Sequence, residues 1–281
     1  MPHQLSISEQ LAHSTVRIET TTADGGGSGT GFFYRFAVKG DTYVPATVTN
    51  KHVVNGATRG QFVLTEKDSN DAPVIGKYHG FGIDNFQNQW IPHPDQNIDL
   101  CAMQIAPILN QAQERNQGFF YVSLDKSLLL TDEELNELIA MEDVVMVGYP
   151  NGIWDQTNNM PIFRKGITAT HPNIDWNGKP EFLIDAACFP GSSGSPVFLF
   201  NQGGYSTKSG GMVIGTSRVK LLGVLYAGPQ HTVSGEIRVV QVPTQNVPVP
   251  VSTIPNNLGM VIKASQPEAF ETIFEQGANE T

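Results

Sequence analysis

The chain has 281 residues, of which 40% are hydrophobic and 16% are charged, a balance typical of a globular protein with a large buried core. Its formal net charge of −10 argues against a nucleic-acid-binding protein, because phosphate groups are bound by basic surfaces. No apolar stretch approaches the ~20 residues of a membrane-spanning helix, so we expect neither a nucleic-acid nor a membrane partner.

The first residues and the two cysteines bear on the cellular compartment. The opening sequence MPHQLSISEQLAHSTVRI lacks the basic, apolar and small-residue segments of a secretory signal. Cys101 and Cys188 both lie in apolar strand-like runs, where we expect buried free thiols in a reducing compartment rather than a disulfide. The sequence therefore predicts a cytoplasmic protein, or a secreted one if a signal has been removed.

Short apolar stretches separated by Gly, Pro, Asn and Asp follow one another along most of the chain, which is typical of strands joined by turns. With 28 glycines and 18 prolines to form turns, this pattern predicts an all-β sandwich or barrel. In chain order, we expect strands within residues 16–18, 31–34, 43–49, 61–64, 100–105, 144–148, 221–225 and 260–263.

Two helices are predicted from capping boxes, one beginning at Thr131 with Glu134 three residues later, the other at Ser265 with Glu268. The first helix divides the strand-rich chain near its middle, which predicts two β-subdomains within one domain. We place the first subdomain at residues 1–115, a connecting segment with the short helix at 116–142, the second subdomain at 143–264, and a C-terminal helix and tail at 265–281.

The stretch FPGSSGSPVF, residues 189–198, is rich in serine and glycine but lies between apolar runs, where flexible linkers are rare. We expect a tight turn that presents the hydroxyl of Ser193. An α/β-hydrolase turn would need glycine two residues on either side of the serine, and Ser195 occupies the second of these positions. The sequence therefore argues against that fold.

Candidate partners for Ser193 lie upstream in the order histidine, aspartate, serine that is used by chymotrypsin. His52 ends a predicted strand, and Asp99 opens an apolar strand, where an unpaired carboxylate would be costly. Asp95 competes with Asp99 but lies in a polar loop. The remaining histidines are expected to be surface or satisfied core residues: His3, His13, His79, His93, His171 and His231.

The blocks TNKHVV, NIDLCAMQI and IDAACFPGSSGSPVF resemble, in this order, the three catalytic blocks of trypsin-like serine endopeptidases, above all the bacterial HtrA/Deg and staphylococcal glutamyl-endopeptidase branches. VMVGYPNG, GITAT, LLGVLYAG and NNLGMVIKA resemble strands of the second barrel and the approach to the C-terminal helix. The resemblance spans residues 16–274 and implies a chymotrypsin-like double β-barrel. The PDZ domain and the basic activation site of some relatives are not found in the sequence.

The resemblance implies a serine endopeptidase that acts through an acyl-enzyme on a protein or peptide substrate. His52 would be the general base, Asp99 would hold its tautomer, and Ser193 would be the nucleophile. The backbone amides of Gly191 and Ser193 would form the oxyanion hole. An alternative function is a catalytically silent module that binds a peptide or protein partner in the same cleft.

The residues expected to bind substrate are Ala187, Leu225, Tyr226, Ala227 and Gly228. By resemblance, Ala187 would lie at the base of the S1 pocket, where it offers no charge to lysine or arginine. Leu225 stands where glutamate-selective relatives have a histidine. We therefore expect an apolar pocket that accepts small or medium apolar P1 residues, with Ala227 and Gly228 pairing with the substrate backbone.

The active-site turn also needs to be ordered. Ser192 stands where zymogen-type relatives have an aspartate that pairs with a new N-terminal amine. Loop packing or a regulatory protein partner must therefore order the turn, and we favour the partner. Residues 151–159 and 228–235 are the candidate mobile loops.

Two other patterns could be mistaken for sites. Residues 25–31, GGGSGTG, resemble a phosphate-binding loop, but they lead into a strand and lack its lysine, so we expect a flexible surface turn. His79, His93 and Asp95 match no metal-ligand spacing. We therefore expect neither a cofactor nor a metal.

Overall fold

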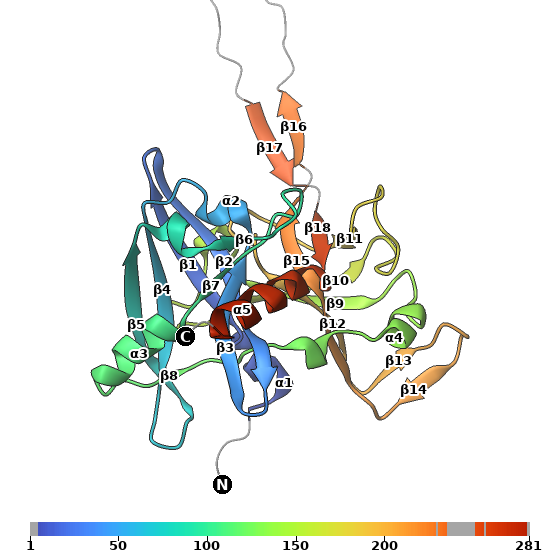
Figure 1. Ribbon diagram of the computed structural model, residues 1–281. Coiled ribbons are helices and arrows are strands. Elements are labelled where there is room, and N and C mark those ends of the chain that lie inside the picture. The colour runs from blue at the N-terminus through green and yellow to red at the C-terminus, as the bar shows by residue number, and fades with distance from the viewer. Residues whose placement is uncertain (1–4, 229, 235–250, 256, 280–281) are drawn as a thin grey trace, which may run out of the picture.

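The computed structural model describes residues 5–228, 230–234, 251–255 and 257–279. Two β-structures lie side by side, one formed by the N-terminal part of the chain and the other by the C-terminal part (Figure 1). The predicted all-β architecture with a C-terminal helix is confirmed.

The first structure is an antiparallel sheet whose long β-strands alternate buried and exposed side chains over part of their length. Its core contains a cluster of aromatic rings, including Phe62, Phe86 and Trp90, which pack edge-to-face against one another. In spatial order the strands are β5 (Pro73–Asp84), β4 (Arg59–Lys67), β1 (Thr15–Thr22), β2 (Gly25–Lys39), β3 (Thr42–Thr49), β7 (Cys101–Gln104) and β6 (Ile91–Pro92), with β8 (Phe119–Phe120) paired to β4.

The second structure is a closed barrel with its own apolar core. Its strands, in order around the barrel, are β10 (Ile162–Thr168), β11 (Glu181–Asp185), β18 (Leu258–Lys263), β15 (Arg218–Ala227), β12 (Pro196–Asn201) and β9 (Asp143–Gly148). Two hairpins project from it, one formed by β13 (Gly204–Ser206) and β14 (Met212–Ile214), the other by β16 (Gln230–Ser234) and β17 (Val251–Pro255) (Figure 1).

Short helices connect these strands. The α-helices are α1 (Ile7–Ala12), α2 (Lys51–Val54), α3 (Ala106–Glu114), α4 (Asp132–Asn136) and α5 (Ala269–Asn279), and the 3₁₀ turns are η1 (Phe86–Gln89), η2 (Lys126–Leu128), η3 (Pro150–Gly152) and η4 (Gln266–Glu268). The capping box predicted at Thr131 is present at the start of α4. The second predicted box is wrong, because Ser265 has helical dihedral angles and its side chain caps no backbone N–H.

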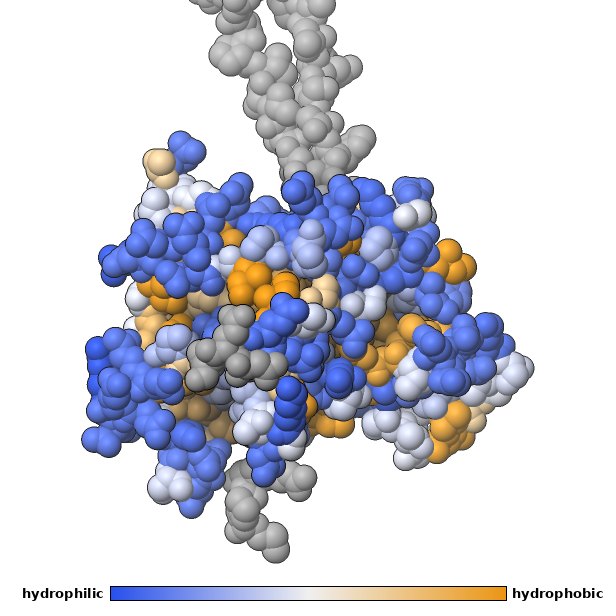
Figure 2. All heavy atoms as spheres, viewed as in Figure 1, coloured by the Kyte–Doolittle hydropathy of each residue, from blue (hydrophilic) through white to orange (hydrophobic). Residues whose placement is uncertain are grey.

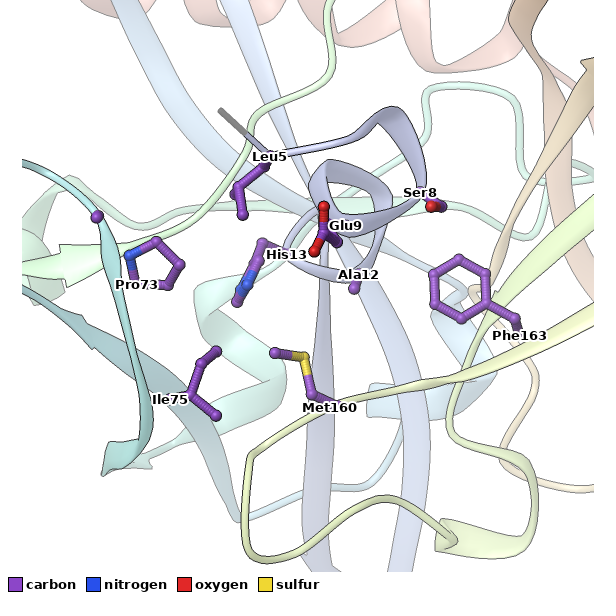
Figure 3. A pocket seen from close by; sticks show the side chains of 10 residues that line it. Leu5, Ser8, Glu9, Ala12, His13, Pro73, Ile75, Met160 and Phe163 are labelled. Atoms are coloured by element: carbon purple, nitrogen blue, oxygen red, sulfur yellow. The ribbon is translucent and has the colours of Figure 1, made fainter. Parts of the chain in front are cut away.

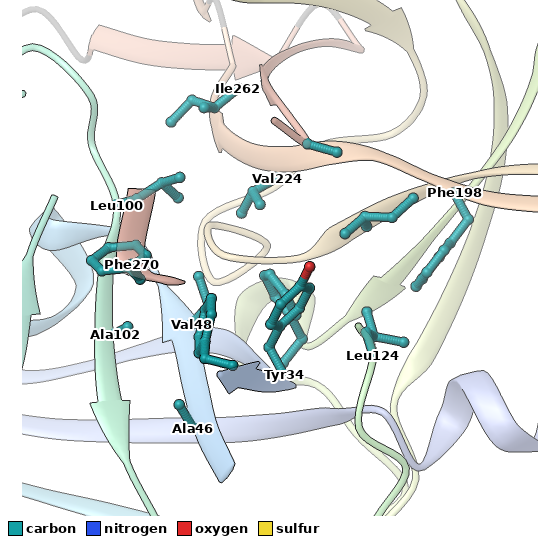
Figure 4. Close-up of a cluster of buried hydrophobic side chains, with 14 of the residues drawn as sticks. Tyr34, Ala46, Val48, Leu100, Ala102, Leu124, Phe198, Val224, Ile262 and Phe270 are labelled. Atoms are coloured by element: carbon teal, nitrogen blue, oxygen red, sulfur yellow. The ribbon is translucent and has the colours of Figure 1, made fainter. Parts of the chain in front are cut away.

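Buried apolar side chains fill the interface between the sheet and the barrel (Figure 4). Phe32, Tyr34 and Val48 come from the sheet, whereas Phe198 and Val224 come from the barrel. Helix α5 closes this cluster with Phe270 and Phe274, each of which lies against the ring of Phe36. Each large apolar side chain buried in this way contributes about 1.5–3 kcal/mol to stability. The interface therefore holds the two halves of the molecule in a fixed relation.

The surface seen in Figure 2 is mainly hydrophilic, as expected when large apolar side chains fill the interior. One apolar patch on this face lies over the β13–β14 hairpin, where Met212 and Ile214 are exposed. Within the described residues, no helix is long and apolar enough to cross a membrane. Cys101 and Cys188 are both free and buried, as predicted.

The glycine-rich segment 25–31 differs from its prediction as a surface turn. It forms the beginning of β2, and residues 29–31 are buried. A side chain on Gly29 would collide with Val53, and one on Gly31 would collide with Thr47. Its glycines therefore allow close packing inside the molecule.

Candidate active site

His52 and Asp99 are brought together by the pairing of two strands in the first sheet. His52 lies in α2 directly after β3, and Asp99 lies just before β7, which pairs with β3. Nδ1 of His52 is 2.5 Å from Oδ2 of Asp99, and the backbone N–H of His52 donates to Oδ1 at 3.2 Å. The side-chain amide of Asn50 donates to the backbone carbonyl of Asp99 at 2.8 Å. The carboxylate thus fixes both the backbone and the ring of the histidine.

Asp95, the competing acid, is engaged in a surface turn. Its Oδ1 accepts hydrogen bonds from the backbone N–H and the side-chain amide of Asn97, at 2.8 and 3.1 Å. Its backbone carbonyl accepts a hydrogen bond from Nζ of Lys51 at 3.2 Å. Among the described residues, Asp99 is therefore the carboxylate that contacts His52.

Ser193 lies in the turn of residues 189–195, called the serine turn below, between β11 and β12 of the barrel. The backbone carbonyls of residues 189 to 193 all accept hydrogen bonds from within the chain. In order from Phe189 to Ser193, their donors are Ser192 N (3.0 Å), Asn151 N (2.5 Å), Thr30 Oγ1 (3.0 Å), Ser195 N (3.0 Å) and Thr30 N (2.8 Å). The orientation of each peptide in the turn is thereby fixed.

Besides the N–H of Phe189 at its start, two backbone N–H groups of the serine turn remain unused among the described residues. Those of Gly191 and Ser193 donate to no group in the part of the chain that the structure describes. Oγ of Ser193 lies 3.4 Å from the carbonyl oxygen of Tyr226, and no hydrogen bond joins it to His52 within the described residues. Two free amides beside a serine hydroxyl can stabilise a negatively charged oxygen.

Glycine is required at two positions of the serine turn. Gly191 has φ +84°, and a Cβ there would lie 2.6 Å from the carbonyl oxygen of Tyr149. Gly194 has φ +87°, and a Cβ there would lie 1.9 Å from the carbonyl oxygen of Thr30. Both conformations are unfavourable for L-residues with side chains, and neither site has room for one. The small residues that suggest a linker in the sequence therefore allow the turn to pack tightly.

Residues 151–159, predicted to form a mobile loop, are packed against the first sheet. Trp154 lies between the guanidinium of Arg17, 5.1 Å from its ring centroid, and the ring of Tyr78, at 5.9 Å. The hydroxyl of Tyr78 donates to the carbonyl of Gln156 at 2.8 Å, and the buried Asn159 donates to Thr65 Oγ1 at 3.0 Å. These contacts hold the segment whose Asn151 N–H supports the serine turn. The other predicted loop, 228–235, lies partly outside the described residues.

The predicted substrate-binding residues occupy different environments. Ala187 is half-buried just before the serine turn. At the end of β15, Ala227 is half-buried and Gly228 is exposed. Leu225, predicted to line an apolar pocket, is only 2% exposed and belongs to the barrel core. Strand alternation directs the side chains of Val224 and Tyr226 to the opposite face, against the core between sheet and barrel.

The backbone of Leu225 nevertheless contributes to the site. Its carbonyl accepts from Gly194 N at 2.8 Å, and its N–H donates to Ser195 O at 2.9 Å, so β15 is fastened to the serine turn. The hydroxyl of Tyr226 lies 3.9 Å from Sδ of Met260. Of the pocket predicted from Ala187, Leu225 and Tyr226, the side chain of Leu225 therefore packs in the barrel core instead.

A cavity of about 610 Å³ opens beside His52 and Asp99. Gln87, Asn88 and Trp90 from the region of η1 line it. The sequence contains no spacing that would identify these residues, because they reach the site only through the folding of the β5–β6 connection. The side chain of His52 is 49% exposed and that of Asp99 is 25% exposed. The His52–Asp99 pair is therefore partly open to solvent.

A second cavity, of about 380 Å³, lies under α1 and away from these residues (Figure 3). It is mainly apolar, with Ile75, Met160 and Phe163 among its walls. His13 points into it, and burial lowers the pKa of this histidine, although Glu9 opposes the shift. No hydrogen bond joins either ring nitrogen of His13 to another described residue, and its ring packs edge-to-face against Phe120.

The cysteines are poor candidates for a nucleophile. Burial raises the pKa of Cys188 to about 12. Burial, reinforced by the nearby charge of Asp99, also raises the pKa of Cys101 well above its ordinary value. Both thiols are therefore protonated at neutral pH, and a thiolate is the form that attacks.

Comparisons with known proteins identify a family and a similar fold. The family model of the trypsin-like peptidase domain matches residues 29–204. A variant of the HtrA-type protease AlgW, solved with a tripeptide, has a similar fold, with 16% sequence identity and a TM-score of 0.50. The match covers 95% of this chain and 62% of that one, so this chain spans less than two thirds of its length.

Two further solved structures are similar at lower scores. The serine endoprotease from Yersinia pestis has 13% identity and a TM-score of 0.48, with 98% of this chain and 69% of that chain covered. The active form of the Rv3671c protease from M. tuberculosis has 17% identity and a TM-score of 0.41, with 94% and 81% covered. No curated protein matches the chain in sequence.

Proposed function

Because this chain belongs to the family of trypsin-like peptidase domains, we propose that it is a serine endopeptidase that uses His52, Asp99 and Ser193 as a catalytic triad. The observation that carries this proposal is the serine turn itself. All its carbonyls from residue 189 to 193 are bonded, and two amides beside the serine hydroxyl are free. The 2.5 Å contact between His52 and Asp99 supplies the matching acid–base pair.

In the first step, Oγ of Ser193 attacks the carbonyl carbon of the substrate and gives its proton to Nε2 of His52. Nε2 is the nitrogen that remains available, since Nδ1 is held by Asp99. The oxyanion of the tetrahedral intermediate accepts hydrogen bonds from the amides of Gly191 and Ser193. His52 then protonates the leaving nitrogen, the C–N bond breaks, and the acyl group remains on Ser193 as an ester.

In the second step, a water molecule gives a proton to Nε2 of His52 and attacks the ester carbonyl. The same two amides stabilise the second oxyanion, and the C–O bond to Ser193 breaks as His52 returns the proton to Oγ. Asp99 stays ionised throughout and stabilises the imidazolium form of His52. The first step begins with a rotation of Ser193 Oγ from Tyr226 O towards His52, since such contacts often tighten only when substrate is bound.

The substrate is a protein or a peptide. The half-buried Ala187 carries no charge, which supports cleavage after small or medium apolar residues. The backbone of Ala227 and Gly228, at the end of β15, would pair with the substrate backbone. An intracellular role is supported by the two buried free thiols of Cys101 and Cys188. The regulatory protein partner expected from the sequence stays a prediction, and within this chain Thr30, Asn151 and residues of the turn itself donate hydrogen bonds to the serine turn.

The proposal is tested with peptide turnover and a fluorophosphonate probe, comparing Ser193→Ala with Ser192→Ala. The Ser192 hydroxyl is buried and without a hydrogen-bond partner among the described residues, so this variant is a matched control. We expect Ser193→Ala and His52→Ala to lose roughly 10⁶ in kcat and Ser192→Ala to remain active. Loss of activity in Ser192→Ala alone would show that the nucleophile is misassigned.

The alternative, a silent module that binds a peptide in the same cleft, gives a different result in this experiment. The wild-type chain would then show neither turnover nor labelling by the probe, whereas peptide binding would persist in Ser193→Ala. Since histidine, aspartate, serine and two free amides are all present, we expect catalysis.

A further inference from the structure

Thr30 in β2 connects the two halves of the candidate active site, and we propose that it is a positioning residue that holds the serine turn in its productive arrangement. This proposal rests on the proposed function, because it concerns the same oxyanion hole. Thr30 is completely buried. Its three polar groups, the backbone N–H, the backbone carbonyl and the hydroxyl, form four hydrogen bonds, and three of these bonds reach the barrel.

The hydroxyl of Thr30 bridges two backbone groups of the barrel. Its Oγ1 accepts a hydrogen bond from the N–H of Tyr149 at 3.1 Å and donates to the carbonyl of Gly191 at 3.0 Å. Because the lone pair is directed at Tyr149, the hydroxyl proton is directed at Gly191. The backbone N–H of Thr30 also donates to the carbonyl of Ser193 at 2.8 Å. One residue thus fixes the carbonyls that follow both oxyanion-hole amides.

Thr30 is also linked to the His52–Asp99 pair, through Thr49 and Asn50. Its carbonyl accepts a hydrogen bond from Oγ1 of Thr49 at 2.6 Å. Thr49 is followed in the chain by Asn50, whose amide donates to the backbone carbonyl of Asp99. A continuous set of hydrogen bonds and one peptide link therefore runs from Asp99 to Gly191 through Thr30.

Removal of the hydroxyl should affect the transition state more than the bound substrate. Without it, the Tyr149 N–H and the Gly191 carbonyl are both buried and unpaired, which favours rotation of the Gly191–Ser192 peptide. The free amides of Gly191 and Ser193 flank that peptide. Their charge stabilisation is needed when the oxyanion forms, so kcat should fall while KM changes little.

The experiment compares Thr30→Val, which keeps the shape and the backbone N–H, with Thr30→Ser, which keeps the hydroxyl. Thr47→Val is the matched control, since Thr47 is also fully buried in the neighbouring strand but its hydroxyl has no hydrogen-bond partner among the described residues. The measurements are kcat and KM on a peptide substrate, affinity for a peptidyl boronate, and urea unfolding of each variant.

We expect Thr30→Val to lower kcat roughly 10- to 100-fold and to weaken boronate binding by a similar factor, with KM within about threefold. Thr30→Ser should recover kcat to within about threefold of wild type, and Thr47→Val should match wild type. If Thr30→Val lowers only the stability and leaves kcat and boronate affinity unchanged, Thr30 has a structural role alone and the proposal is overturned.

Backbone NMR separates this result from a failure of the proposed function. In Ser193→Ala, which needs no turnover, adding Thr30→Val should shift the amide resonances of Gly191 and Ser192 and speed hydrogen exchange at Tyr149. Adding Thr47→Val should change none of them. Unchanged resonances and exchange in Thr30→Val would contradict the proposal even in a chain that hydrolyses no peptide.

Discussion

The serine turn and the His52–Asp99 pair, the two parts of the proposed active site, are held in different ways. The turn is fixed by backbone hydrogen bonds from Thr30, Asn151 and its own residues, and it is built around glycines that leave no free space. The pair is held by the carboxylate of Asp99, which contacts the ring and the backbone N–H of His52, and the histidine is 49% exposed beside a cavity of about 610 Å³.

This difference separates two parts of catalysis. In the proposed mechanism the fold itself would prepare the electrostatic part, the oxyanion hole, because its donors are backbone groups whose directions are set by packing. The acid–base part is completed by substrate, which excludes water from His52 and Asp99 when it covers them. Changes in the pair should therefore alter chemistry without altering the fold, and changes in the turn should alter both.

After the loss of Ser193 or His52 itself, the largest effect is expected for Asp99→Asn. An asparagine can keep the geometry but favours the wrong tautomer of His52, so kcat should fall by roughly 10⁴. Circular dichroism and urea unfolding should show a folded chain of nearly normal stability, as the pair is partly exposed. Asp95→Asn is the control and should stay active. Equal losses in the two variants would contradict the different roles given to these acids.

A somewhat smaller loss of activity, with a loss of stability, is expected for Gly194→Ala. The new methyl group would lie 1.9 Å from Thr30 O at φ +87°, so the serine turn must move and both amides lose their alignment. We expect kcat to fall by at least ~10³, since one oxyanion donor alone contributes about 10²–10³. Kinetics and urea unfolding measure the two effects.

The control for this variant is Gly210→Ala, because Gly210 has nearly the same φ, +84°, with no atom within 4 Å of the added Cβ. It carries the dihedral strain without the collision. Gly210→Ala should lose about 1 kcal/mol of stability and no activity. A fully active Gly194→Ala variant would mean that the turn is not as tightly packed as the structure indicates.

A modest effect is expected for Tyr78→Phe, which removes the hydrogen bond to Gln156 O and loosens the segment that carries Asn151. The free energy of unfolding should fall by about 0.5–1 kcal/mol, and kcat by no more than about fivefold. Tyr205→Phe is a comparable change in the barrel that keeps the ring under Arg218. Tyr205→Phe should leave kcat unchanged. A similar fall in kcat for both variants would contradict the proposed link between Tyr78 and the serine turn.

The smallest effect concerns the cavity under α1. Burial lowers the pKa of His13 from its ordinary value near 6.5, so folding disfavours the protonated ring. The stability is therefore complete above the pKa of the unfolded chain and falls as the pH drops from there towards the lowered folded pKa. His13→Phe should weaken this pH dependence by less than ~1 kcal/mol in urea unfolding between pH 7 and 5. A pH dependence identical to wild type would contradict the burial of a neutral His13.

The sequence predicts the parts of the site that depend on local pattern. Strand runs, the Thr131 capping box and the ordered His52, Asp99 and Ser193 blocks are all visible because each is defined by neighbours in the chain. Whether these three residues act as a triad remains for kinetics to test.

The parts that could not be predicted depend on contacts between distant segments. Thr30 lies in a glycine-rich segment expected to be a surface turn, yet it meets Gly191 more than a hundred residues later. Leu225 is assigned to a pocket by resemblance to glutamate-selective relatives, whereas strand alternation places it in the barrel core. Residues 151–159 look mobile by composition, but Tyr78 and Thr65 hold them from the other half of the molecule.

The central claim is that the serine turn of the isolated chain already has the geometry of an oxyanion hole. The most direct test is a crystal structure of the intact chain with a peptidyl boronate on Ser193, compared with the free chain. We predict a boronate oxygen about 2.7–3.1 Å from the backbone nitrogens of Gly191 and Ser193, with Asn151 N still bonded to Pro190 O. A turn that rearranges to bind the boronate, or one that binds it only after a partner is added, would contradict the account.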